Sequence, residues 1–498
     1  MTGILFLQLL TALSVFVCRP KGHAQEPGGL PTQNGAETAL LAPKVPDSNG
    51  GPETSLLALI RKAGGEEKEA EELVGRFLGA GPVGWDPSFD EKVRNSSPEE
   101  CSRMLGVILI QRGDSVLAEE GLKYLEMAAK EDSVTAMEDL ATIYLEGAKG
   151  IEPDPGRAVE WLREARQLPG AKRAYEMLGD LAMEGRGMPR DEVLAVEYYR
   201  RGVEAGSTGS GLALHRLLRE GDRLPRDLME AERLARAAAD AGSPEAAYEL
   251  GVFYERYVEG APNWGRASEW LSKAMEGGNT AAVRRLADYW FEGRRGPVDA
   301  NKGLELLRKA AAMNDGEACL RLAALYETGQ FLPQDPVAST AWVRIAAGFG
   351  HASAENLYGL RLISGYGVAS DPVEAARWFE RAAFRGWGDA QVNLATLKQN
   401  GLGMETDLVG ALDWYAKAAK NGNVDAQERL ARLLAESTDS SLRDPLQAAF
   451  WAASAAGAGG EAVSGLAAEL RDRLSPAQVE ELDRLLADSE NEVTPFSE

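Results

Sequence analysis

The sequence is poor in the residue types that most often build disulfides, metal sites and nucleophilic centres. It holds three cysteines and three histidines in 498 residues. So few cysteines exclude a fold built on disulfides, and so few histidines leave no set for a zinc cluster or a histidine-centred triad. Cys101 and Cys319 are expected to be small buried side chains. The composition therefore predicts no catalytic residue, no metal site and no cofactor.

Positive charge is also scarce. The chain has 54 lysines and arginines against 77 aspartates and glutamates, for a formal net charge of -23. Nucleic acids and anionic lipid surfaces repel such a chain. The charge excludes nucleic acid as a partner and favours other proteins or peptides.

Long apolar runs are absent apart from one at residues 4–17, which precedes the small-residue sequence Gly22-His23-Ala24. This pattern is typical of a secretory signal peptide, although no lysine or arginine precedes the run. It predicts a signal over residues 1–24, an exported protein, periplasmic or secreted, and no transmembrane span after signal removal. Residues 25–54 are rich in proline and glycine and indicate a flexible linker, followed by an N-terminal helical segment over residues 55–96.

A period of 36 residues organises the rest of the chain. One bulky position recurs without insertion from residue 178 onward, with two earlier members at slightly different spacing: Leu105, Leu140, Leu178, Leu214, Leu250, Leu286, Leu322, Tyr358, Leu394, Leu430 and Leu466. A second bulky position, often tryptophan, follows about 20 residues later, and a small residue stands four positions beyond it. The helical register of Trp270, Trp342, Trp378 and Trp414 favours core packing over a cofactor or sugar platform.

Glycine and aspartate recur at fixed positions in the 36-residue period. Glycines such as Gly185 and Gly401 stand seven residues after the bulky position, where a left-handed residue ends a helix. Aspartates such as Asp191 and Asp371 stand six residues further on and suit the first turn of a second helix. The pattern predicts an all-α fold, a right-handed α/α superhelical solenoid of about ten 36-residue helix-turn-helix repeats over residues 97–459. Residues 460–498 are expected to form C-terminal capping helices and an acidic tail.

The best-formed repeat resembles a known family. It reads DAQVNLA at residues 389–395, GLG at 401–403, Asp407 and ALDWYAKAA at 411–419, and the preceding repeat carries AARWFERAA at 375–383. This pattern is similar to the Sel-1-like repeat, a relative of the tetratricopeptide repeat. The resemblance implies a non-catalytic adaptor or scaffold that binds other proteins.

Two alternative functions stay open from the sequence alone. One is a hydrolase of the cell envelope acting on glycans, peptides or β-lactams, although no Ser-x-x-Lys motif occurs in the chain. The other is a structural spacer that assembles with itself.

Two features exceed what helix packing demands. The first is a row of polar residues next to the recurring leucine: Arg284, Arg285, Arg321, Asn393 and Arg429. By resemblance to tetratricopeptide repeats, this row is a candidate for binding peptide carboxylates or backbone. The alternative is a set of solvated or salt-bridged side chains.

The second feature is the turn between repeats, where His351 and Trp387 replace the Ser, Asn or Asp of other repeats. An aromatic side chain in such a turn is a candidate contact for a partner. The alternative is packing on the neighbouring loop.

Overall fold

The computed structural model describes residues 52–63, 73, 74, 77, 88–112, 115–221, 223–257, 261–437, 439–458 and 463–492. Over these residues the secondary structure consists of 24 α-helices and one short 3-10 helix. The chain divides into an N-terminal half, Met1–Ala246, and a C-terminal half, Ala247–Glu498, which are described separately. The predicted signal over residues 1–24 and most of the predicted linker lie outside the described residues.

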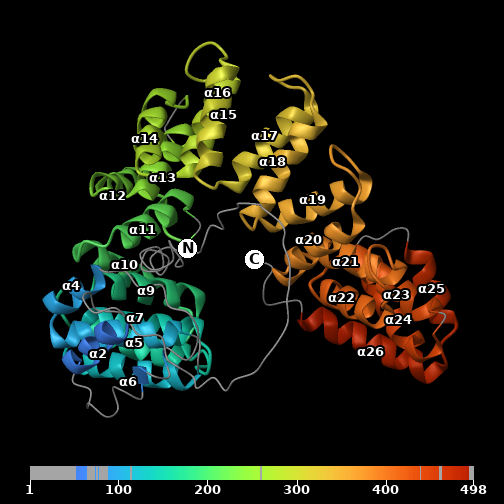
Figure 1. The fold of residues 1–498 in the computed structure, drawn as a ribbon, viewed down its shortest axis with the longest axis horizontal. Helices are drawn as coiled ribbons and strands as arrows, with labels where there is room; N and C mark the ends of the chain where they lie inside the picture. The colour runs from blue at the N-terminus through green and yellow to red at the C-terminus, as the bar shows by residue number, and fades with distance from the viewer. Residues whose placement is uncertain are drawn as a thin grey trace, which may run out of the picture. The chain divides into compact units, whose positions relative to one another are not determined.

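Ten helical hairpins follow one another along the chain, and Figure 1 shows them in chain order. The first helices of the hairpins are α5 (Pro98–Gln111), α7 (Val134–Glu146), α9 (Lys172–Glu184), α11 (Thr208–Glu220), α13 (Pro244–Arg256), α15 (Thr280–Glu292), α17 (Gly316–Thr328), α19 (Ala352–Ser364), α21 (Gly388–Asn400) and α23 (Val424–Glu436). The second helices are α6 (Ser115–Lys130), α8 (Pro155–Ala165), α10 (Glu192–Glu204), α12 (Leu228–Asp240), α14 (Trp264–Glu276), α16 (Ala300–Ala312), α18 (Pro336–Gly348), α20 (Pro372–Phe384), α22 (Leu408–Lys420) and α24 (Pro445–Gly457). The prediction of an all-α solenoid of about ten repeats is confirmed.

Local residues start and stop these helices as the sequence predicts. The carboxylate of Asp191 accepts from the backbone N–H of Leu194 at 3.0 Å, and that of Asp371 accepts from Glu374 at 2.9 Å. Gly185 ends α9 with a φ of +71°, a conformation that side chains disfavour. The helix boundaries therefore follow from short-range hydrogen bonding.

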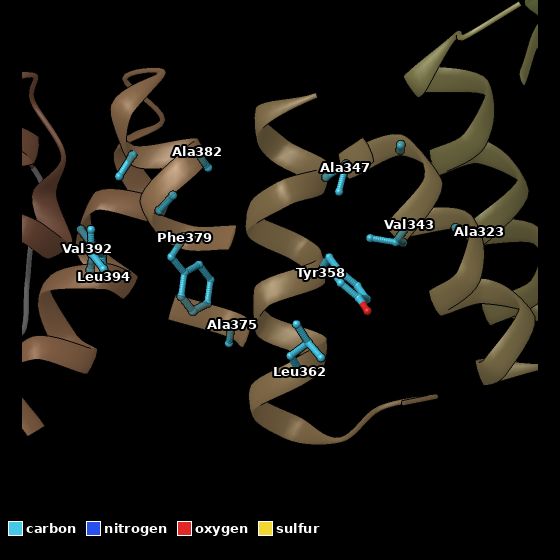
Figure 2. Packing of buried hydrophobic residues seen from close by; sticks show 14 of the residues in the cluster. Ala323, Val343, Ala347, Tyr358, Leu362, Ala375, Phe379, Ala382, Val392 and Leu394 are labelled. Atoms are coloured by element: carbon cyan, nitrogen blue, oxygen red, sulfur yellow. The ribbon is translucent and has the colours of Figure 1, made fainter. Parts of the chain in front are cut away.

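The recurring leucine position forms the core. Its members from Leu105 to Leu430 are at most 4% exposed, and first helices that carry them pack against second helices, as α9 does against α8 and α10 and as α19 does against α18 and α20. Figure 2 shows this packing in the C-terminal half, where Tyr358 and Leu362 of α19 lie between α18 and Phe379 of α20. Cys101 and Cys319 are both free and fully buried, as predicted.

The prediction that the tryptophan position lies in the core is only partly right. Trp270 and Trp414 are 7% and 9% exposed, but Trp342 and Trp378 are half-buried. The side chain one residue later occupies the deeper site, as with Val343 at 0% exposure. Trp342 and Trp378 pack against the core from its edge, and a cation three residues after the tryptophan often covers the ring. The Nζ of Lys273, for example, lies 3.8 Å from the ring centre of Trp270.

Additional helices flank the repeats at both ends. Helix α2 (Pro52–Lys62) begins three residues before the predicted boundary of the N-terminal segment, and α4 (Ser88–Asn95) precedes the first repeat. Helices α25 (Ser464–Asp472) and α26 (Pro476–Glu492) follow the last repeat, where capping helices are predicted. None of the helices in the described ranges has the length and apolarity needed to cross a membrane.

Candidate functional site

Arg285, a predicted partner-binding residue, lies in an ion pair between two repeats. Its Nε donates to Glu255 of α13 at 2.7 Å, and Glu255 is only 6% exposed. The hydroxyl of Tyr289 donates to the same carboxylate at 2.5 Å. The Arg285 guanidinium thus compensates a buried charge, which burial would otherwise make costly.

The other members of the predicted row also have partners within the protein. Arg284 pairs with Asp315 at 3.2 Å and Arg321 pairs with Asp288 at 2.5 Å, each bridging neighbouring first helices. The Asn393 amide donates to Asn356 at 2.8 Å, also across repeats, whereas Arg429 pairs with Asp425 of its own helix at 2.9 Å. The structure therefore gives the row a role in joining repeats, and its role in binding a partner stays a prediction.

The two aromatic turn residues differ in their surroundings. The Nε2 of His351 lies 3.0 Å from Glu317 of the preceding repeat, and its Nδ1 lies 3.0 Å from the Ser353 hydroxyl. Trp387 is 40% exposed and starts α21 without a side-chain cap. The His351 ring is thus bound by its neighbours, while Trp387 presents part of its indole to solvent.

A groove of about 400 Å³ lies in the N-terminal half, where no partner-binding residue was predicted. It runs across the first helices of four consecutive repeats. Its walls comprise Thr142, Leu145 and Glu146 from α7, Arg173, Glu176, Met177, Asp180, Leu181 and Glu184 from α9, Arg186 from the following loop, Gly209, Leu212, Ala213 and Arg216 from α11, and Glu245 from α13. Such a volume accommodates a few side chains of a ligand.

Asp180 stands in the middle of the α9 contribution to this groove. Its carboxylate accepts a hydrogen bond from the Tyr199 hydroxyl of α10 at 2.8 Å. Burial, together with the nearby charges of Glu176 and Glu184, raises the pKa of Asp180 to about 6, although the Tyr199 bond acts in the opposite direction. The pKa of Tyr199 is raised too, first by its burial and then by the Asp180 charge.

Glu138 of α7 is a second perturbed carboxyl, close behind the groove. It is 6% exposed, and its Oε1 accepts from the backbone N–H of Ala174 in the first turn of α9 at 3.0 Å. Burial raises the pKa of Glu138 to about 7, although Arg173 and the Ala174 bond favour the ionised form. Because Ala171, the residue at the N-cap of α9, has no side-chain acceptor, Glu138 caps this helix from the preceding repeat.

The sequence does contain a signal for the groove. Glu176, Asp180 and Glu184 are spaced four residues apart, which aligns carboxylates on one side of a helix. Glutamates recur at this helix end, as at Glu146 and Glu220, so Glu184 by itself cannot be distinguished from the repeat pattern. The other walls of the groove come from residues about 36 or more positions away. Among the residues that the structure describes, no group of three or more His, Cys, Asp or Glu side chains is arranged to hold a metal ion.

The sequence profile of the Sel1 repeat family matches ten consecutive segments: residues 100–133, 134–168, 172–207, 211–243, 244–279, 280–315, 316–348, 352–386, 388–423 and 424–460. No curated protein matches the chain significantly.

Several solved structures are similar to the chain. One is c5321, a protective antigen of uropathogenic Escherichia coli strains with an SLR fold, at 24% identity and a TM-score of 0.44, covering 88% of this chain and 95% of that one. Another is a Sel1 repeat protein from Oxalobacter formigenes, at 22% identity and a TM-score of 0.38, covering 79% and 98%. Yeast Tom70 matches at 13% identity and a TM-score of 0.40, covering 78% and 84%.

Proposed function

The chain belongs to the Sel1 repeat family through ten consecutive repeats, and we propose that it is a non-catalytic scaffold that holds a partner polypeptide. The proposed docking site is the groove on the first helices of the N-terminal half. A stack of helical hairpins presents its first helices side by side, so one extended ligand can contact several repeats at once.

The groove carries this proposal. It is formed by four successive first helices rather than by one repeat, and it combines buried apolar side chains with charged groups. Sites of this composition bind ligands by burying apolar surface while a few polar groups fix the orientation. The predicted row in the C-terminal half supports the proposal less, because its side chains are already bound to neighbouring repeats.

Site-directed photo-cross-linking tests the docking site. A photoreactive amino acid replaces Ala213, a half-buried groove residue, or Glu197, an exposed residue of α10 outside the groove. We expect the protein labelled at Ala213 to form discrete adducts with one or a few polypeptides in the producing cell, and the protein labelled at Glu197 not to form them. The same adducts at both positions, or adducts at Glu197 alone, would contradict docking in the groove.

We also propose that the scaffold acts outside the cytoplasm, as the signal-like residues 1–24 suggest. The support is the sequence pattern alone. Mass spectrometry of the protein purified from the producing cell tests this point. A mature N-terminus at Gln25 in an exported fraction is expected, and full-length protein confined to the cytoplasm would refute export.

A further inference from the structure

The groove has an apolar floor. Met177 and Leu181 of α9 and Leu212 of α11 all line it, and they are 6%, 3% and 5% exposed. Leu145 of α7 and Ala213 of α11, which are half-buried, line it as well. A ligand side chain placed there would bury aliphatic surface against them, which favours a long apolar stem.

The three arginines of the groove are held by acceptors of the protein itself. Arg173 donates to the Thr142 hydroxyl at 3.2 Å, and Arg186 donates to the backbone carbonyl of Leu145. Arg216 pairs with Glu245 at 2.8 Å and so offsets one of the groove carboxylates. The groove lining thus carries three guanidinium groups against the five carboxylates of Glu146, Glu176, Asp180, Glu184 and Glu245, which leaves it net negative.

The carboxylates of α9 form no ion pair with these arginines. Glu176 accepts from the Ser207 hydroxyl at 2.8 Å, and Asp180 accepts from the Tyr199 hydroxyl. Both donors are neutral, and within the described ranges Glu176, Asp180 and Glu184 form no ion pair. Three negative charges thus line one side of a partly buried groove, where a cation would relieve their mutual repulsion.

We propose that this groove accepts a lysine or arginine side chain of the partner polypeptide, an inference that rests on the proposed function. The aliphatic stem lies on Met177, Leu181 and Leu212, and the cationic head lies among Glu176, Asp180 and Glu184. The groove provides the space for the side chain. The apolar floor favours a long aliphatic stem, and the carboxylates favour a positively charged end.

Other ligands use only part of this arrangement. A bare metal ion or a short amine leaves the apolar floor uncovered, and an acidic peptide meets uncompensated carboxylates. An uncharged aliphatic side chain covers the floor but provides no positive charge for the carboxylates. Lysine and arginine combine a long stem with a terminal charge, which matches both parts of the groove.

A set of host peptides separates the contributions of stem and charge. The probe is an acetylated and amidated heptapeptide, Gly-Ser-X-Gly-X-Ser-Gly, in which X is lysine, 2,4-diaminobutyrate, norleucine or glutamate. Diaminobutyrate keeps the charge on a short stem, and norleucine keeps the stem without the charge. We expect the lysine peptide to bind about ten-fold or more tightly than each of the others, measured by calorimetry or by NMR titration of the full chain at a fixed moderate salt concentration.

Protein variants locate the effect. The groove variant combines Glu176→Gln, Asp180→Asn and Glu184→Gln. The control combines Glu197→Gln, Glu305→Gln and Glu380→Gln, three exposed glutamates outside the groove, and changes the net charge by the same amount. We expect the groove variant to lose about ten-fold or more of its affinity for the lysine peptide and the control less than about two-fold. Circular dichroism verifies that both variants keep their helicity.

Each other result has a defined meaning. Equal binding of the lysine and diaminobutyrate peptides, or equal losses in both variants, would show bulk charge attraction and overturn the inference. Preferred binding of the norleucine or glutamate peptide at the groove would overturn the inference while leaving the proposed function standing. If no peptide binds, the inference fails, and the photo-cross-links at Ala213 decide separately whether the groove docks a polypeptide.

Discussion

Glu138 offers the sharpest test of how neighbouring repeats stabilise each other. Its carboxylate on α7 accepts from the backbone N–H of Ala174 on α9, where Ala171 provides no cap of its own. Replacing it by glutamine keeps an oxygen acceptor and removes the charge. Replacing it by alanine removes both.

The magnitude follows from the pKa of Glu138, about 7 in the folded protein against an ordinary 4.5. At about 1.4 kcal/mol per pKa unit, ionisation of the folded protein costs about 3 kcal/mol more than ionisation of the unfolded chain. Because the pKa of Glu138 is raised in the folded state, the free energy of unfolding falls by this amount as the pH rises from about 4.5 to about 7. Above that range it falls no further on account of Glu138.

We therefore expect Glu138→Gln to match the wild type near pH 4.5 and to be more stable by up to about 3 kcal/mol near pH 8. Glu138→Ala should be less stable than Glu138→Gln by about 1–2 kcal/mol at both pH values, because the Ala174 N–H loses its acceptor. The control is Glu146→Gln, which changes an exposed side chain on the same helix and should alter the stability by less than about 0.5 kcal/mol.

Hydrogen exchange of the Ala174 amide is the appropriate assay, since repeats can open separately and a single unfolding transition need not report one site. Urea unfolding followed by circular dichroism gives the corresponding global value. The reasoning is refuted if Glu138→Gln follows the wild type within about 0.5 kcal/mol at both pH values, or if Ala174 exchanges equally in the glutamine and alanine variants.

Three further predictions concern contacts between helices. Arg285→Met should destabilise the protein by about 2–4 kcal/mol in urea unfolding because it leaves the buried Glu255 charge unpaired. Arg233→Met, which removes an exposed pair with Glu230 of the same helix, should cost under about 0.5 kcal/mol. Equal losses would contradict the structural role of the row. Gly179→Ala should cost about 1–3 kcal/mol, since the new Cβ would lie 2.4 Å from the Tyr199 ring, while Gly457→Ala, with open space around it, should be neutral or slightly stabilising. Tyr199→Phe should raise the pKa of Asp180 further above about 6, by about half a unit to one unit in a carboxyl NMR titration, because the hydroxyl donor is lost; an unchanged midpoint would exclude this hydrogen bond.

The tryptophan position shows where sequence periodicity stops being informative. Period and hydrophobicity place Trp342 and Val343 on neighbouring parts of one helix face, but only packing decides that Val343 is fully buried and Trp342 half-buried. Lys273 over Trp270 and Arg381 over Trp378 are equally dependent on three-dimensional position. A large aromatic side chain at the edge of the core satisfies the same pattern as one at its centre.

The sequence by itself determined the repeat and the helix boundaries. These features depend on composition and on contacts within a few residues, such as Asp191 capping its own helix and Gly185 ending the one before. Only the tertiary structure decided that Arg285 forms an ion pair with Glu255, that Glu138 caps the first helix of the next repeat, and that the α9 carboxylates line a groove. These contacts join residues about 30 to 40 positions apart, and stacking of the repeats brings them together without leaving a pattern in either segment alone.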